Sequence, residues 1–97
     1  MKTTYIIFTE QGRIRGRING SVLKVTSKGT QRVTDFDFSP GMNRGIDSEI
    51  ANALVKSNEW PKESLTNGDY INYDYKEQNN IEFVKIEGRG INYLNIG

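Results

Sequence analysis

Residues 13–32, RIRGRINGSVLKVTSKGTQR, carry six Lys or Arg side chains and no Asp or Glu. Within them, Asn19-Gly20 separates two runs of β-favouring residues. Both central residues of a two-residue type I′ turn need positive φ, which Gly accepts freely and Asn tolerates. The stretch therefore predicts a β-hairpin over residues 13–27 that reverses at Asn19-Gly20.

This hairpin would sort its side chains between two faces, because neighbours in a strand point to opposite sides of a sheet. The core face is expected to carry Ile14, Ile18, Leu23 and Val25. The opposite face is expected to carry Arg13, Arg15, Arg17 and Lys24. If Gln11-Gly12 forms a second tight turn, Phe8 lies opposite Arg15 among the guanidinium groups, and Tyr5 and Ile7 join the core face.

The positive charge of the chain is concentrated in its first third. Residues 1–34 hold seven positive side chains and one negative (+6), whereas residues 35–97 hold six positive and eleven negative (−5), which together give the net charge of +1. Asymmetry of this kind can build a basic face that an acidic partner recognises.

Length and composition set limits on the class of protein. Ninety-seven residues with no internal repeat or long polar linker predict one domain over residues 1–97. Apolar residues make up only 35% of the chain, so the core has to use its large side chains efficiently or share them with a partner, for example in a homodimer. The apolar run at residues 5–8 is too short for a signal peptide or a membrane span, and we expect a soluble, cytoplasmic protein without membrane contact.

The chain contains no Cys and no His. Their absence removes disulfides, thiol chemistry, imidazole catalysis and the usual zinc ligands. Asp35 and Asp37 stand two residues apart, but nothing nearby completes a site for a hard cation. We therefore expect neither an enzyme, nor a metal site, nor a cofactor.

The remaining elements follow from side-chain periodicity. Strands are expected over residues 3–10, 30–39, 69–77 and 81–87, with Thr34, Phe36 and Phe38 on one face of the second of these. Residues 47–57 predict a helix that is capped by Asp47 or Ser48 and has a stripe of Ile50, Ala53 and Leu54. Trp60 is expected to cover the core beyond this helix. Residues 88–97 can add a last strand or pack loosely over the sheet.

The order β-β-β-α-β-β predicts a mainly β domain with one helix, either a small OB-like β-barrel or a curved antiparallel sheet. An α+β roll is the alternative if Gln11-Gly12 is a true turn. The element order resembles that of small OB-fold nucleic-acid-binding proteins, with Tyr5–Ile18 as a long bent first strand. NGDYINYDY, residues 67–75, is similar to the Gly-Asp-x-aliphatic entry into the fourth strand of that family.

The leading functional hypothesis is a non-enzymatic module that binds single-stranded DNA or RNA. Phosphates need counter-charges and unstacked bases need aromatic platforms, and like charges such as Arg15 and Lys24 would repel each other across the hairpin unless a counter-charge is bound. The expected binding residues are Arg13, Arg15, Arg17, Lys24, Lys28, Arg32 and Phe8.

Two other interpretations stay open. The basic stripe can be a solvated outer face whose charges form ordinary ion pairs with Asp35, Asp37 or later Glu residues, and Tyr73 and Tyr75 are expected in the core rather than as ligand platforms. A second functional hypothesis is a small protein-interaction module, or a phage-type inhibitor. Such a protein would occupy a partner's surface through its sheet face or through an acidic, nucleic-acid-mimicking surface.

Overall fold

The computed structural model describes residues 2–11, 17–39, 45–67 and 69–88. Its elements, in chain order, are β1 (Thr3–Gln11), β2 (Ile18–Thr26), β3 (Gly29–Phe38), α1 (Ile46–Lys56), the 3₁₀ helix η1 (Lys62–Ser64), β4 (Leu65–Thr66), β5 (Tyr70–Ile71), α2 (Tyr73–Gln78) and β6 (Ile81–Gly88). Residues 89–97, for which the sequence left open a last strand or loose packing over the sheet, lie outside the described residues.

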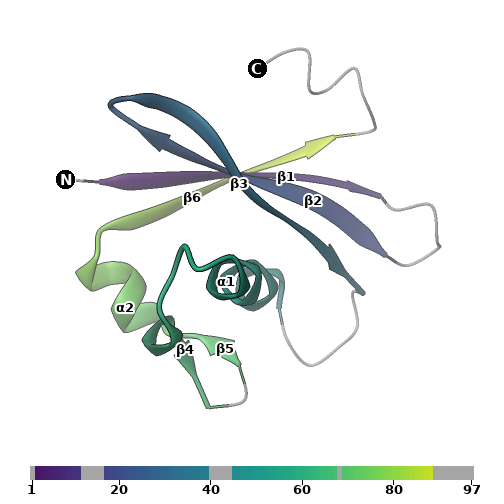
Figure 1. The fold of residues 1–97 in the computed structure, drawn as a ribbon. Coiled ribbons are helices and arrows are strands. Elements are labelled where there is room, and N and C mark those ends of the chain that lie inside the picture. The colour runs from purple at the N-terminus through teal and green to yellow at the C-terminus, as the bar shows by residue number, and fades with distance from the viewer. Residues whose placement is uncertain (1, 12–16, 40–44, 68, 89–97) are drawn as a thin grey trace.

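Four strands form one sheet in the order β3-β2-β1-β6, and β4 and β5 form a separate small hairpin. β2 is antiparallel to both β1 and β3, whereas β6 is parallel to β1. The expectation of a purely antiparallel sheet is therefore wrong, because the chain crosses below the sheet through α1 before β6 returns beside β1 (Figure 1). In the described part of the chain the strands form an open sheet and do not close into a barrel.

The reversal expected at Asn19-Gly20 is also wrong, since both residues lie inside β2. The chain turns instead at Ser27 and Lys28, where Gly29 adopts φ +123°. The amide of Lys28 donates a hydrogen bond of 3.2 Å to the hydroxyl of Thr26, which fixes this turn locally. β1 and β2 consequently pair in another register than expected.

Gly20 allows atoms of the two neighbouring strands to approach its backbone closely, and it does not form a turn. A Cβ atom at this position would lie 2.3 Å from the ring of Phe36, its partner on β3, and 2.3 Å from the carbonyl oxygen of Phe8 on β1. Only glycine leaves room for that ring and that carbonyl in the middle of a strand. Gly20, which together with Asn19 predicted a hairpin turn, thus has a packing role within β2.

The register places Leu23 opposite Ile6 and Val22 opposite Ile7. Val22 and Ile7 are completely buried under α1, together with Tyr5. Leu23 and Val25 therefore point away from the face that carries Tyr5 and Ile7, contrary to the prediction. A shift of one residue in a strand moves every side chain to the other face.

One hydrophobic core fills the space between the sheet and α1. Phe36 and Phe38 of β3 point into it, as their alternation predicted, and the helix expected at residues 47–57 is confirmed as α1. The predicted cap is wrong, because Gly45 is the N-cap and makes no side-chain hydrogen bond. The core consists of Tyr5, Ile7, Val22, Phe36, Phe38, Ile50, Ala51, Leu54, Trp60 and Ile71.

The strand expected over residues 69–77 is replaced by the two-residue β5 and by α2. The side chain of Asn72 accepts hydrogen bonds from the amides of Asp74 (3.0 Å) and Tyr75 (3.2 Å), which caps a helix at the point where the alternation predicted a strand. Tyr73 is consequently 59% exposed and not in the core, whereas Tyr75 is half-buried against it.

Trp60 covers the core as predicted, and its indole N–H takes part in a short chain of hydrogen bonds with Tyr5 and Glu59. Its indole N–H donates to the hydroxyl of Tyr5 (3.1 Å), which in turn donates to the carboxylate of Glu59 (3.0 Å). The ammonium of Lys24 lies 2.7 Å from the same carboxylate. Burial raises the pKa of Tyr5, so this hydroxyl remains a hydrogen-bond donor at neutral pH.

Candidate functional site

The face of the sheet opposite α1 is the main candidate surface. Both helices lie on the other side of the sheet (Figure 1), and among the described residues no helix covers this face. Because Tyr5 and Ile7 point toward α1, the alternate residues of each strand point away from it. We call this surface the open face; its centre consists of Ile6, Phe8, Leu23, Val25, Val84 and Ile86.

These aliphatic side chains lie next to one another across three strands. Ile6 of β1 is paired with Leu23 of β2 on one side and with Val84 of β6 on the other. Val84 is 39% exposed and Ile6 and Leu23 are half-buried, whereas Ile7 on the opposite face is completely buried. A contiguous apolar surface that still contacts water is typical of an interaction site.

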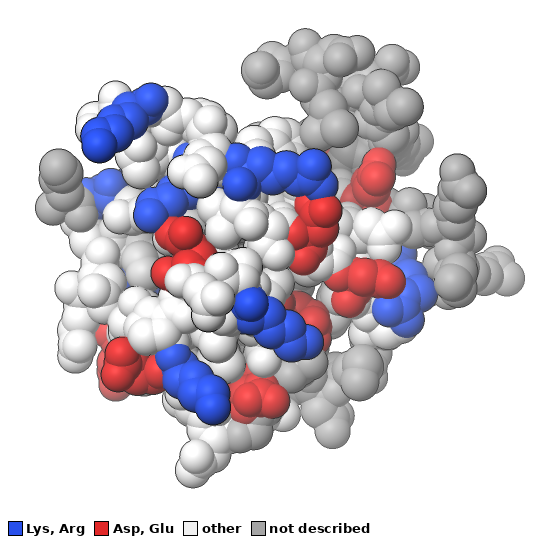
Figure 2. Space-filling view, in the orientation of Figure 1, with Lys and Arg blue, Asp and Glu red and all other residues white. Residues whose placement is uncertain are grey.

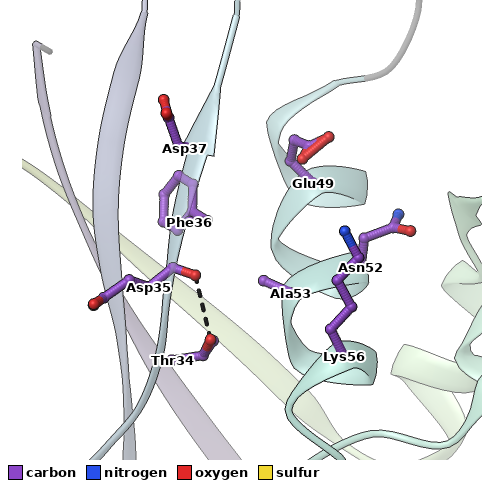
Figure 3. A pocket seen from close by; sticks show the side chains of 8 residues that line it. All are labelled: Thr34, Asp35, Phe36, Asp37, Glu49, Asn52, Ala53 and Lys56. Atoms are coloured by element: carbon purple, nitrogen blue, oxygen red, sulfur yellow. Dashed lines mark hydrogen bonds between the residues drawn. The ribbon is translucent and has the colours of Figure 1, made fainter.

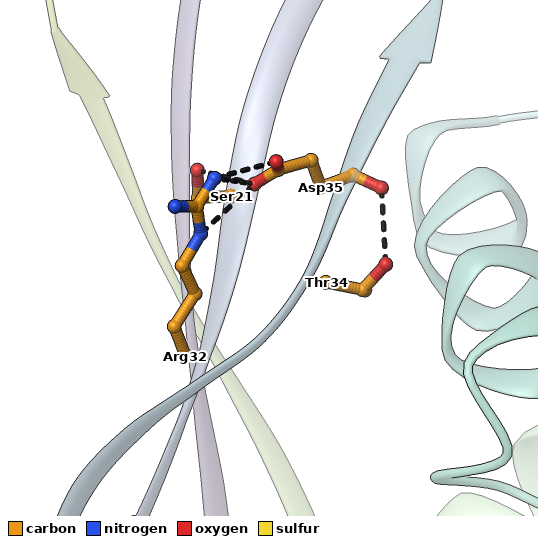
Figure 4. Close-up of polar contacts among 4 residues, drawn as sticks. All are labelled: Ser21, Arg32, Thr34 and Asp35. Carbon is orange, nitrogen blue, oxygen red and sulfur yellow. Dashed lines mark hydrogen bonds and ion pairs between the residues drawn. The ribbon is translucent and has the colours of Figure 1, made fainter.

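Ion pairs border the open face. Arg32 and Asp35, both on β3, approach to 2.5 Å, and the hydroxyl of Ser21 donates a further hydrogen bond of 2.9 Å to Asp35 (Figure 4). The hydrogen bond from Arg32 holds the pKa of Asp35 below its usual range. Two further border pairs are Arg17 with Asp37 (3.0 Å) and Lys2 with Glu82 (3.1 Å). Each of these three cations is thus paired with a carboxylate, and the exposed Glu10 of β1 adds a further negative charge to the described part of the open face.

The basic residues predicted from the sequence do not form one stripe where the structure describes them. Lys24 lies on the face covered by α1 and pairs with Glu59, whereas Arg17 and Arg32 lie at the border of the open face. Lys28 is exposed in the β2–β3 turn. On the side drawn in Figure 2, Lys and Arg side chains alternate with Asp and Glu side chains. Arg13 and Arg15 lie outside the described residues.

The expectation that Asp35 and Asp37 are partners in ordinary ion pairs is confirmed. Phe8, expected opposite Arg15, is instead paired with Ser21 on β2 and Ile86 on β6. It belongs to the open face, and its partners on β2 and β6 are a hydroxyl and an aliphatic side chain. Nothing in the described geometry tests whether nucleic acid binds here, and that function stays a prediction.

The Arg32–Asp35 pair is expected to stabilise the fold at neutral pH and to lose this contribution in acid. The pKa of Asp35 is lower in the folded chain than in the unfolded chain, so the contribution is complete above about pH 4 and disappears as the pH falls through the folded value. The two side chains are 64% and 57% exposed, so solvent screens the pair and its contribution is small. Urea unfolding of Asp35→Asn and the unmodified chain should differ at pH 7 and coincide near pH 2. An equal difference at both pH values would contradict this assignment.

A second candidate is a hollow of about 200 Å³ between β3 and α1 (Figure 3). Glu49 and Lys56 stand at its two ends on α1. The amide of Asn52 between them already donates to the carbonyls of Ser48 and Asp69, both at 2.7 Å. Among the residues that the structure describes, no group of three acidic side chains could hold a metal ion. The hollow is small and polar, and its central amide has a structural role.

The sequence prediction missed the open face because it assigned one apolar face to each strand. Residues 5–8, YIIF, and residues 83–86, FVKI, place apolar side chains on both faces of β1 and β6. An apolar run without alternation of apolar and polar residues is typical of a strand that is covered on both faces. That run was the available signal for a second apolar surface.

No family model, curated protein or solved structure matches this chain. Neither of the described α-helices has the length and apolar character needed to cross a membrane. A proposal about function therefore has to come from the geometry of the chain itself.

Proposed function

We propose that this chain is a non-enzymatic protein-interaction module that binds the surface of another polypeptide through its open face. The observation that carries the proposal is the strip of partly exposed Ile6, Leu23 and Val84 within a border of neutralised charges. Protein interfaces have this anatomy, with an apolar centre and a polar rim.

The pairing of the border charges favours a protein over a nucleic acid. A nucleic-acid phosphate needs a cation, and Arg17 and Arg32 each already bind a carboxylate at 3.0 Å or less. Binding a phosphate would mean breaking these pairs or adding negative charge beside Asp35 and Asp37. An apolar protein surface needs no such exchange.

Covering the strip supplies the driving force. Burial of apolar surface contributes about 25 cal/mol per Å², so each partly exposed aliphatic side chain adds roughly 1 kcal/mol when a partner covers it. Five aliphatic side chains are available at the centre of the open face: Ile6, Leu23, Val25, Val84 and Ile86. Their sum of about 5 kcal/mol is similar to the lower estimates of the cost of association, so polar contacts at the border have to contribute to the complex as well.

Site-specific photocrosslinking tests the proposal. The photoreactive amino acid p-benzoylphenylalanine is placed at Val84 on the open face or, as the matched control, at Tyr73, which is more exposed but lies on α2. In cells that naturally produce the chain, irradiation should give a protein adduct from position 84 and not from position 73. The adduct should be sensitive to protease and insensitive to nuclease. An adduct that nuclease removes, or no adduct from position 84, would reject the proposed function.

A further inference from the structure

We infer that the polypeptide which covers the open face is a second copy of this chain. The inference rests on the proposed function and names its partner. The two copies would pack sheet against sheet, about 10 Å apart, in a symmetric dimer.

The charge distribution of the open face suits a copy of itself. A face that binds a strongly charged partner carries a large excess of the opposite charge, whereas on this face each of Lys2, Arg17 and Arg32 is paired with a carboxylate and only Glu10 adds to them. Two identical faces with a large excess of one charge would repel each other, whereas two identical faces that carry both charges can place opposite charges opposite one another. The apolar centre is complementary to another apolar centre.

The position of the charges selects one arrangement of the two copies. With a two-fold axis along the strands, β3 of one copy would cover β6 of the other and place Arg32 and Asp35 over Val84. With the axis across the strands, β6 covers β6 and β3 covers β3. The aliphatic side chains then meet one another, and each Arg32 approaches Asp35 of the second copy. We therefore infer the second arrangement.

This arrangement brings Val84 close to Val84 of the second copy. Val84 shares its level in the sheet with Ile6 and Leu23, between the level of Val25 and that of Ile86. Arg32 also lies at the level of Val84, because it pairs with Leu23, whereas Asp35 lies at the level of Ile86. Since residues on a two-fold axis face their own copies, an axis midway between these two levels brings each Arg32 opposite Asp35 of the second copy. Val84 then lies opposite Ile86 of the second copy and about 7 Å along the strands from its own copy.

The size of the open face agrees with a reversible dimer. Four strands about 4.8 Å apart, with about eight residues of 3.3 Å each, give a flat area of roughly 500 Å² per copy. Stable complexes bury about 800 Å² per partner, and transient ones bury less. We expect a monomer–dimer equilibrium with a dissociation constant of micromolar order. Dimerisation would also give a chain with 35% apolar residues a second core.

Single-cysteine variants test this geometry, because the chain has no cysteine of its own. Purified Val84→Cys is treated with a short bismaleimide and should form a covalent species of twice the chain mass. Tyr73→Cys is the matched control, since its thiol would be more accessible yet far from the axis; it should remain monomeric. Sedimentation equilibrium of the unmodified chain should show the reversible dimer, and Val84→Lys should weaken it by roughly tenfold or more, because a buried unpaired charge opposes association.

The outcomes separate this inference from the proposed function. Equal crosslinking of Val84→Cys and Tyr73→Cys, or a monomer at millimolar concentration, would overturn the second copy as partner. If position 84 still forms an adduct with a different protein in cells, the interaction module stands with another partner. An adduct confined to one chain, for example to residues 89–97, would overturn both. The emission of Trp60 reports whether each variant is folded.

Discussion

Replacing Trp60 with alanine is expected to lower the free energy of unfolding by about 3–5 kcal/mol. Trp60 is 4% exposed, stacks on Phe83 with ring centroids 5.7 Å apart, and contacts the rings of Tyr5 and Tyr75. Its removal would leave a cavity where β1, β6 and α2 meet. It would also remove the hydrogen bond that orients the hydroxyl of Tyr5. Urea unfolding followed by far-UV circular dichroism measures the loss.

Trp60→Phe separates packing from hydrogen bonding. The phenyl ring keeps most of the contact with Phe83 but cannot donate to Tyr5, so the expected cost is about 1–2 kcal/mol. Tyr5 would still donate to Glu59, which keeps the carboxylate and Lys24 in place. If Trp60→Ala were within 1 kcal/mol of the unmodified chain, the cluster around Trp60 would not be part of the stabilising core.

Replacing Gly20 with alanine is expected to destabilise the fold by about 1–3 kcal/mol. Alanine at a strand position with free space would cost little, because glycine is itself a poor strand residue. Here the added Cβ would lie 2.3 Å from both the Phe36 ring and the carbonyl oxygen of Phe8. The ring can move, but the carbonyl belongs to the central strand β1 and cannot move without disturbing the sheet.

Gly45→Ala is the matched control for Gly20→Ala. Gly45 has φ −77°, and nothing lies within 4 Å of a Cβ built on it. Because Gly45 is the N-cap of α1, where glycine is preferred to alanine, the same chemical change should cost at most about 1 kcal/mol and no steric strain. Chemical denaturation of both variants under identical conditions makes the comparison. Equal effects at the two positions would show that the contact between Gly20 and Phe36 does not restrict the strand.

Local periodicity was sufficient for elements whose own side chains decide their state. The alternation of Phe36 and Phe38 with Asp35 and Asp37 predicted β3 and its buried face. The spacing of Ile50 and Leu54 predicted α1 in the same way. In both elements the apolar pattern and the tertiary contacts favour the same conformation, and local reasoning succeeds under that condition.

Two local signals failed because other contacts outweighed them, one between strands and one within the same segment of chain. Asn19-Gly20 favours a turn, but Gly20 is needed within β2 to accommodate Phe36. The alternation around Tyr73 favours a strand, but Asn72 caps the helix α2, which precedes β6 in the chain. Because the reversal at Asn19-Gly20 was predicted wrongly, Leu23 and Val25 were assigned to the wrong face of the sheet. The sequence prediction therefore missed the open face.

The sequence by itself determined the existence of β3, α1 and β6, the buried faces of β3 and α1, and the absence of thiol and imidazole chemistry. These features depend on residue types and on periods of two or 3.6 residues. Only the tertiary structure decided the strand register, the parallel return of β6 and the partner of each charge. Register depends on which side chains fit opposite one another, and an ion pair depends on distances between residues far apart in the chain. Neither quantity is contained in a local pattern, and both define the open face.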